Sequence, residues 1–274
     1  MQKKYIKTEH STPNSATRKY IIIGGAIALL VIAFCAISYY SKIKINLAVA
    51  CNKDACHENV FLLHGEVKSG SWPLVLVGIK YMTTQHPEIK TICISSQGGE
   101  VSDAIMIADA IYANGLNTCL ASRYELSEDR HLSVDGLCQS SCTWMILAGK
   151  DRILYDDKIE LGFHAARDNS GNRSDDDLPM LINKVKNYVS RRPDPLTETK
   201  KLSRLSWWAF QQGTKRETTN CTAHELQSKY PYFTDVRSWN TAPARSCGLK
   251  APEDVQEILD LEVHLYGFEA NQIS

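Results

Sequence analysis

Two serines enclosed by two cysteines are the first residues in this 274-residue chain that could do chemistry. They lie in the stretch CQSSCTWMILAG, residues 138–149, whose apolar part from Cys142 to Ala148 is typical of a buried helix. A serine at a helix start either caps the helix through its hydroxyl or serves as a nucleophile beside the free N–H groups. Taken alone, the pattern at Ser140 and Ser141 favours the cap.

Two other stretches carry the groups that acyl transfer needs. LGFHAAR, residues 161–167, ends an apolar strand-like run at His164, whose imidazole could accept a proton from a serine. SSQGGEV, residues 95–101, puts a glycine pair between a strand and a helix, where backbone N–H groups can bind an oxyanion. Each stretch alone has a plainer interpretation, a half-buried histidine or a tight turn. Their occurrence together, in this order, is more specific than any one of them.

The elements that must position these residues alternate between strands and helices. Strands are expected at 60–67, 89–95, 117–121, 153–155 and 159–163, and helices at 71–86, 101–114, 142–148, 178–190, 196–212 and 252–266. Residues 123–136 and 167–177 are polar and are expected to form loops. Strands and helices that alternate with short connections predict an α/β fold with βαβ units on a parallel sheet.

A membrane anchor is predicted before this domain. Residues 21–40, IIIGGAIALLVIAFCAISYY, contain no charge and match the thickness of a bilayer core. Five basic residues precede the run and two follow closely, which places the N-terminus in the cytoplasm and the rest outside. We therefore expect a cytoplasmic tail at 1–20, a transmembrane helix at 21–40, a linker at 41–59 and a periplasmic domain at 60–274, in a bacterial inner membrane. A cleaved signal peptide ending at Ala-Val-Ala, 48–50, is the alternative, although that tripeptide lies well beyond the apolar run.

Cysteine content agrees with export to an oxidising compartment. Of nine cysteines, Cys35 lies in the apolar run and eight follow it, an even number that favours disulfides. At least one of two close pairs is expected to be bridged, while Cys93 or Cys119, both inside apolar runs, is expected to be a free buried thiol. The candidate pairs are Cys51 with Cys56 and Cys138 with Cys142. The segment around Cys51 could form half of a zinc site, but it has no second ligand pair, so no metal or cofactor is predicted.

Charge balance restricts the class of partner. Lys and Arg together number 31, as do Asp and Glu, so no basic field argues for nucleic acid. The expected partners are a peptide or protein substrate and the membrane; a homo-oligomer is compatible with the sequence, which does not decide it.

The order of these motifs resembles the proteolytic subunit of Clp protease, within the crotonase-like superfamily. The matching stretches are LLHGEV, SQGGEV, CQSSCTWMILAG and LGFH, within a resemblance that covers about residues 60–235. The resemblance implies a crotonase-like superhelix of ββα units and a serine peptidase. Counting back from Ala148-Gly149 aligns Ser140 with the nucleophile, and His164 aligns with the catalytic histidine. Gly99 and Ser141 would then supply the oxyanion hole.

The chain departs from the family pattern at the third member of the triad. Where the family has an aspartate, the segment KRETTNCTAHEL, 215–226, has none and contains Glu217, Thr218 and Asn220 instead. Glu217 is the candidate to orient His164, and a Ser–His dyad remains open. The predicted function is a membrane-anchored serine peptidase that acts on peptides outside the cytoplasm. An inactive binding or scaffolding protein and a hydrolase of small acyl groups are the alternatives.

Overall fold

The computed structural model describes residues 42–129, 131–167, 172, 174, 177–212, 218–238 and 246–251. All of them belong to one compact unit, Lys42–Ser274. The anchor expected at 21–40 and the helix expected at 252–266 lie outside the described residues. Among the helices that are described, none combines the length and the apolar character needed to span a bilayer.

An eight-stranded sheet forms the framework, in the order β11-β8-β4-β3-β2-β1-β5-β6. The strands β2, β3, β4, β8 and β11 run parallel, as the alternation of elements predicts, whereas β1, β5 and β6 pair antiparallel. The sheet is therefore mixed rather than parallel. Its strands are β1 (Ile43–Cys51), β2 (Cys56–Gly65), β3 (Thr91–Ser95), β4 (Asn117–Leu120), β5 (Arg123–Leu126), β6 (Ser133–Asp135), β8 (Arg152–Leu154) and β11 (Asp235–Val236).

The antiparallel strands correct two expectations. Residues 41–59, expected as a linker, hold β1 and the start of β2, and residues 123–136, expected as a loop, hold β5 and β6. In β1 the larger apolar side chains alternate with smaller or polar ones, the period-two pattern of a strand, but this pattern directly follows the apolar run at 21–40. The tripeptide 48–50, proposed as a cleavage site, lies inside β1, and both of its alanines are buried.

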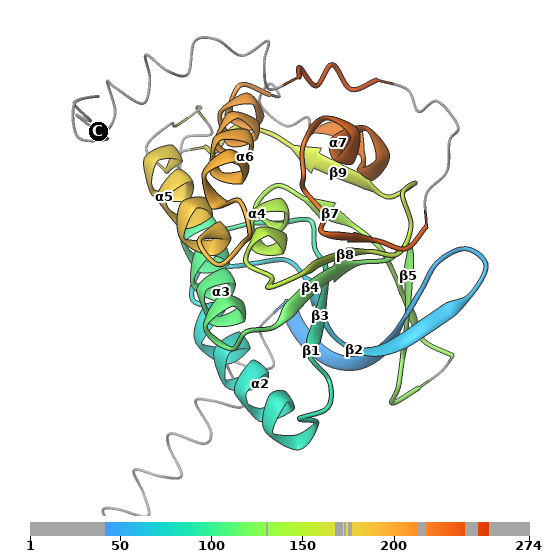
Figure 1. The fold of residues 1–274 in the computed structure, drawn as a ribbon. Helices are drawn as coiled ribbons and strands as arrows, with labels where there is room; N and C mark the ends of the chain where they lie inside the picture. Colours follow the sequence, from blue (N-terminus) through green and yellow to red (C-terminus); the bar gives the residue numbers. More distant parts are fainter. Residues whose placement is uncertain are drawn as a thin grey trace, which may run out of the picture. The chain divides into compact units, whose positions relative to one another are not determined.

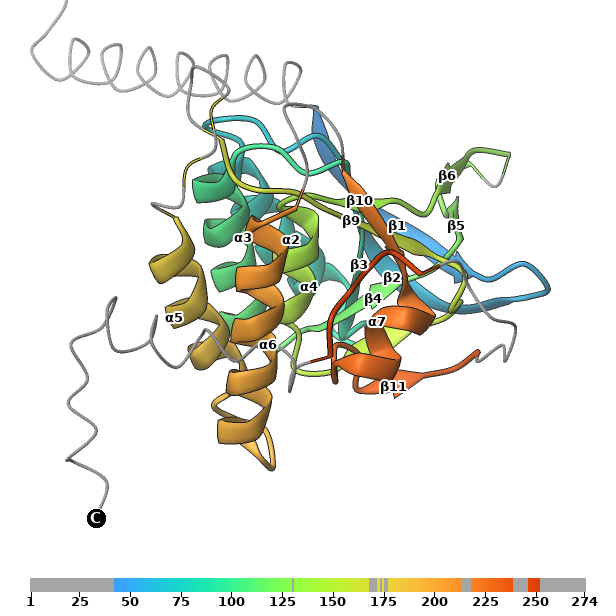
Figure 2. The same cartoon turned by 90° about the horizontal axis from the view of Figure 1, so that it is seen from above.

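The helices gather on one side of the large sheet, apart from the short α7 (Figure 1 and Figure 2). α2 contacts α3, α3 contacts α5, and α5 packs along α6. Their bounds are α2 (Trp72–Gln85), α3 (Val101–Ala113), α4 (Cys142–Leu147), α5 (Leu178–Val189), α6 (Pro195–Phe210) and α7 (Ala223–Lys229).

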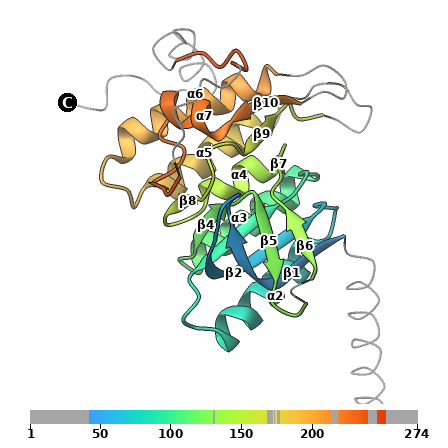
Figure 3. The ribbon, with the colours of Figure 1, turned by 90° about the vertical axis from the view of Figure 1, so that its right-hand side faces the viewer.

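A second sheet, of three strands, has the order β10-β9-β7. It consists of β7 (Cys138–Gln139), β9 (Glu160–Phe163) and β10 (Thr219–Thr222), and β7 runs parallel to β9. A parallel bridge between Ser96 and Cys138 joins β7 to the extension of β3. Figure 3 shows this smaller sheet above the large one. The chain segments that leave β3, β7 and β9 at their carboxyl ends are consequently neighbours, and these segments carry the motifs singled out above.

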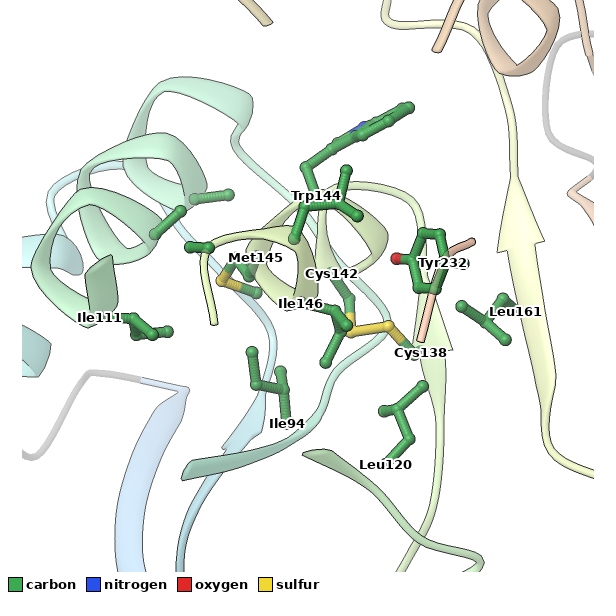
Figure 4. Packing of buried hydrophobic residues seen from close by; sticks show 14 of the residues in the cluster. Ile94, Ile111, Leu120, Cys138, Cys142, Trp144, Met145, Ile146, Leu161 and Tyr232 are labelled. Carbon is green, nitrogen blue, oxygen red and sulfur yellow. A yellow bond between two sulfur atoms is a disulfide. The ribbon is translucent and has the colours of Figure 1, made fainter. Parts of the chain in front are cut away.

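Helix α4 lies at the centre of the core, and all six of its residues are buried. It contacts α3, α5 and strands of both sheets. Figure 4 shows Met145 and Ile146 facing Ile94 and Ile111, and the Cys138–Cys142 disulfide at the helix start. The Tyr232 hydroxyl donates to the Thr143 carbonyl, which anchors the helix further. Tight packing on every side fixes the rotation of α4 and hence the direction of the turn that precedes it.

Four disulfides occur among the described cysteines. Both short-range candidates are bridged, Cys51–Cys56 with Cα atoms 3.9 Å apart and Cys138–Cys142 with Cα atoms 5.3 Å apart. The expectation that Cys93 or Cys119 is a free thiol is wrong. The parallel pairing of β3 and β4 places them directly opposite, with Cα atoms 4.3 Å apart, close enough for a bridge. The fourth bridge joins Cys221 to Cys247.

Candidate active site

Ser140 lies in a strained turn between β7 and α4. Its φ angle of 55° is in the left-handed region, and it is the one non-glycine residue with a positive φ in the described part of the chain. The Ser140 N–H donates to the Gly162 carbonyl of β9 at 2.7 Å, and its own carbonyl accepts from the N–H and hydroxyl of Thr143. Contacts on both sides therefore hold the backbone in a conformation that serine rarely adopts, as is common at functional sites.

His164 follows β9 directly, two residues after the carbonyl that binds Ser140. Its Nδ1 lies 2.6 Å from the Ala165 carbonyl oxygen, which can only accept a hydrogen bond. Nδ1 therefore carries the proton, and the neutral imidazole presents its lone pair at Nε2. The Ala165 N–H is itself bonded to the Gln212 carbonyl at 2.9 Å, so the segment that follows α6 holds the peptide group between His164 and Ala165.

The glycine pair forms the facing wall of the site. Both glycines have positive φ, 86° at Gly98 and 134° at Gly99. Val67 donates to the Gly98 carbonyl and accepts from the Glu100 N–H, so the Gly99 N–H between them faces the other way. A Cβ on Gly99 would lie 1.9 Å from the Val67 carbonyl oxygen, and one on Gly98 would lie 2.6 Å from the Ser140 Cβ. Only glycine permits the two loops to approach this closely.

One cavity joins these groups. It has a volume of about 430 Å³ and is lined by Gly98, Gly99, Ser140, Ser141 and His164 together with side chains from α4 and α6. The Gly99 and Ser141 N–H groups are free of hydrogen bonds within the described residues. A serine hydroxyl, an imidazole and two N–H groups thus line one opening, and acyl transfer requires groups of these kinds.

Aromatic and acidic residues complete the lining. Trp144 and Phe210 contact each other with ring centroids 6.4 Å apart, and they form an apolar part of the wall. Glu66, Glu100 and Asp177 contribute carboxylates, and Arg167 contributes a guanidinium. Glu66 pairs with the exposed Lys42 at 3.1 Å, and its hydrogen bond and charge raise the pKa of that lysine.

The residue expected to orient the histidine, Glu217, lies outside the described residues. Its neighbours in the sequence form a local contact, because the Thr218 hydroxyl donates to the Asn220 Oδ1 at 3.1 Å. Asn220 lies opposite Gly162 in the β9–β10 pairing. The group found at the histidine Nδ1 is instead the Ala165 carbonyl. The sequence does not mark this group, because every residue has a carbonyl and no side-chain type identifies the one that is used.

Comparisons with known proteins give a likeness in structure only. No family model matches the sequence, and no curated protein matches it. Among solved structures, the catalytic domain of ClpP protease from Plasmodium falciparum is 13% identical with a TM-score of 0.42, covering 68% of this chain and 87% of that one. A membrane-bound stomatin-specific protease, 1510-N, solved with a substrate peptide, is 11% identical with the same TM-score of 0.42, covering 65% of this chain and 74% of that one. At such values the activity has to be deduced from the residues of this chain.

Proposed function

We propose that this chain is a serine peptidase with Ser140 as the nucleophile and His164 as the general base. The observation that supports this most directly is the turn at Ser140. Ser140 is left-handed, is bonded through its N–H to Gly162 and faces the same cavity as the histidine. Its conformation costs stability, and such strain is commonly retained where the side chain has a function. A helix cap would not need this strain, and neither serine makes a side-chain cap bond to α4.

The residues support a two-step acyl transfer. Ser140 Oγ attacks the carbonyl carbon of the scissile peptide bond as His164 Nε2 takes its proton, and the carbonyl oxygen becomes an oxyanion. The N–H groups of Gly99 and Ser141 bind that oxyanion. His164 then gives its proton to the leaving nitrogen as the carbon–nitrogen bond breaks. Water attacks the acyl-serine in the same manner, with His164 again as base, and restores the free hydroxyl.

The Ala165 carbonyl replaces an acid in this scheme. By accepting from Nδ1 it favours the tautomer that leaves Nε2 free to accept a proton. It also supplies a partial negative charge to the imidazolium that forms in each step. A Ser–His dyad with a backbone acceptor is therefore our interpretation of the missing aspartate, and Glu217 is not needed at Nδ1.

We further propose that the peptidase is tethered by residues 21–40 and faces the periplasm. The uncharged run and the asymmetry of the basic residues around it support this topology, and four disulfides are in accord with an oxidising compartment. Protease added to spheroplasts should digest the domain after residue 41 and spare the tail before the run. Protection of the domain would contradict this topology.

Labelling with a fluorophosphonate tests the activity, because such reagents phosphonylate an activated serine and leave ordinary hydroxyls unchanged. We expect the wild type to be labelled and the Ser140→Ala variant to be unlabelled. Label that is retained in Ser140→Ala and lost in Ser141→Ala would mean that the wrong serine has been assigned. A folded wild type without label would favour the binding or scaffolding protein.

A panel of peptides and short acyl esters then separates a peptidase from a hydrolase of small acyl groups. The cavity is lined by an apolar aromatic wall and by several charged side chains, which suits a chain of amino-acid residues better than a single short acyl group. Turnover of the esters alone would favour the second enzyme class.

A further inference from the structure

The hydroxyl of Ser141 is a buried polar group without a function in the fold. The residue is 1% exposed, and its Oγ makes no hydrogen bond within the described part of the chain. Although Ser141 is the N-cap residue of α4, its side chain accepts no N–H of that helix. Buried hydroxyls are nearly always bonded, since an unbonded one destabilises the folded state. Because no described residue satisfies it, a partner from outside the chain is a candidate for this hydrogen bond.

The partner has to enter through the active-site cavity, because Ser141 lines that cavity and is buried on its other sides. The serine Oγ and its own backbone nitrogen are separated by only three bonds. Rotation about the Cα–Cβ bond can therefore bring the hydroxyl to a ligand atom that accepts a hydrogen bond from the Ser141 N–H. In the proposed reaction that ligand atom is the carbonyl oxygen of the scissile bond.

We infer that the Ser141 hydroxyl is a third hydrogen-bond donor to the oxyanion, in addition to the N–H groups of Gly99 and Ser141. This inference rests on the proposed acyl transfer and adds a side-chain donor to it. During attack, the new bond joins Ser140 Oγ to the carbonyl carbon and the π electrons move to the oxygen. The Ser140 proton moves to His164 Nε2. Ser141 keeps its own proton throughout and only shares it with the negatively charged oxygen.

The donor should act on the reaction step more than on binding, because the oxygen gains its charge only on the way to the tetrahedral state. The fluorophosphonate is a suitable reagent here, since its phosphoryl oxygen also gains negative charge during attack. For Ser141→Ala we expect the maximal rate constant of inactivation to fall by about a hundredfold, with the apparent dissociation constant of the reagent changed less than threefold.

Stability provides the second measurement. Removing a buried, unbonded hydroxyl, as Ser141→Ala does, should leave the melting temperature of the unliganded protein unchanged or raise it by a few degrees. Loss of rate together with unchanged or increased stability is the pattern of a group kept for function. A residue that served packing alone would lose stability and rate together.

Ser203 is the matched control, because it is the other serine with a buried, unbonded hydroxyl among the described residues. It is 2% exposed, it lies on α6, and it does not line the cavity. Ser203→Ala should have the same effect on the melting temperature and no effect on the rate of inactivation. This comparison separates removal of any buried hydroxyl from removal of the one at the active site.

The outcomes are distinct. The third donor is supported if Ser141→Ala is inactivated about a hundredfold more slowly than the wild type and melts no lower. Ser203→Ala should then be inactivated at the wild-type rate. A Ser141→Ala variant labelled within threefold of the wild-type rate overturns the donor and leaves the peptidase proposal intact. A Ser141→Ala variant that loses rate and melts lower than the wild type also overturns the donor, in favour of packing. A wild type that is not labelled removes the proposed function, and the donor with it.

Discussion

The backbone N–H of Ser140 donates to the carbonyl of Gly162 at 2.7 Å. This bond continues the parallel pairing of β7 with β9, in which Cys138 lies opposite Leu161 and Gln139 opposite Gly162. Ser140 and His164 are thus placed by one register, since His164 is the second residue after Gly162. A shift of one residue in this pairing would turn the strand side chains to the opposite face. Sheet pairing, more than any side-chain contact, aligns the two groups.

The close approach of Gly98 to the Ser140 turn predicts that Gly98→Ala lowers activity. The new Cβ would lie 2.6 Å from both the Gln139 carbonyl oxygen and the Ser140 Cβ, so the serine turn must move. We expect labelling by fluorophosphonate to slow at least tenfold and unfolding to become easier by about 2 kcal/mol. Gly115→Ala is the control, because Gly115 also has a positive φ, of 62°, but has open space around it. The free energy of unfolding of that variant should fall by about 1 kcal/mol, and its labelling rate should stay that of the wild type.

The carbonyl at Nδ1 predicts that Glu217 is dispensable. Because Ala165 already accepts the Nδ1 proton, Glu217→Gln should be labelled within about threefold of the wild-type rate. His164→Gln, which removes the base, should slow labelling by about 10³-fold or more. The rate constants of labelling for the two variants show whether Glu217 is needed for activity. A Glu217→Gln variant as slow as His164→Gln would show that the carboxylate completes the triad after all.

Strain at Ser140 predicts that glycine stabilises this position more than alanine does, the reverse of the usual order of stability. Both Ser140→Ala and Ser140→Gly should be unlabelled, but glycine has no Cβ to clash at a φ of 55°. Ser140→Gly should therefore be more stable than Ser140→Ala by about 1 kcal/mol, as measured by urea unfolding. Equal stability of the two variants would mean that the turn is not strained.

A carboxylate beside the Cys221–Cys247 disulfide predicts a pH-dependent contribution to stability. Burial raises the pKa of Glu225, but the Cys247 N–H, the Ser246 hydroxyl and the Lys229 ammonium outweigh it and hold the pKa below its usual 4.5. The stabilisation is therefore present above about pH 4.5 and is lost as the pH falls through the lowered value. Glu225→Gln should melt below the wild type at pH 7, by the equivalent of about 1–2 kcal/mol, and the gap should close toward pH 3.

Calorimetry from pH 7 to pH 3 checks this, with Glu128→Gln as control because Glu128 is exposed. A gap between the wild type and Glu225→Gln that is unchanged at pH 3 would contradict the lowered pKa. The control variant should follow the wild type at every pH.

The pairing of the cysteines predicts the peptides that remain linked without reduction. Four bridges use the eight cysteines from Cys51 onward and leave Cys35 as the one thiol open to alkylation in the denatured protein. Mass spectrometry of an unreduced digest should recover the segments of β3 and β4 linked through Cys93 and Cys119. Alkylation of Cys93 and Cys119 before reduction would contradict the bridge and would mean that they are free thiols.

Amino-acid order alone determined the elements that depend on local periodicity. Helices α2 and α3 and strands β3 and β4 begin and end within two residues of the expected bounds, because turns and apolar spacing are local signals. Ser140, His164 and the glycine pair could also be picked out, since nucleophiles, bases and adjacent glycines are residue types with chemical meaning. β1, β5 and β6 were missed, because a strand needs a partner that sequence does not display.

Only the tertiary structure decided how these groups meet. The left-handed turn at Ser140 follows from the packing of α4 and from the bond to Gly162, neither of which leaves a local pattern. The Cys93–Cys119 bridge depends on the register of β3 with β4, across 26 residues of chain. The acceptor at His164 Nδ1 is the main-chain carbonyl of Ala165, and main-chain groups are the same in every residue. Long-range register and backbone direction arise from packing of the whole domain, so they became visible only in three dimensions.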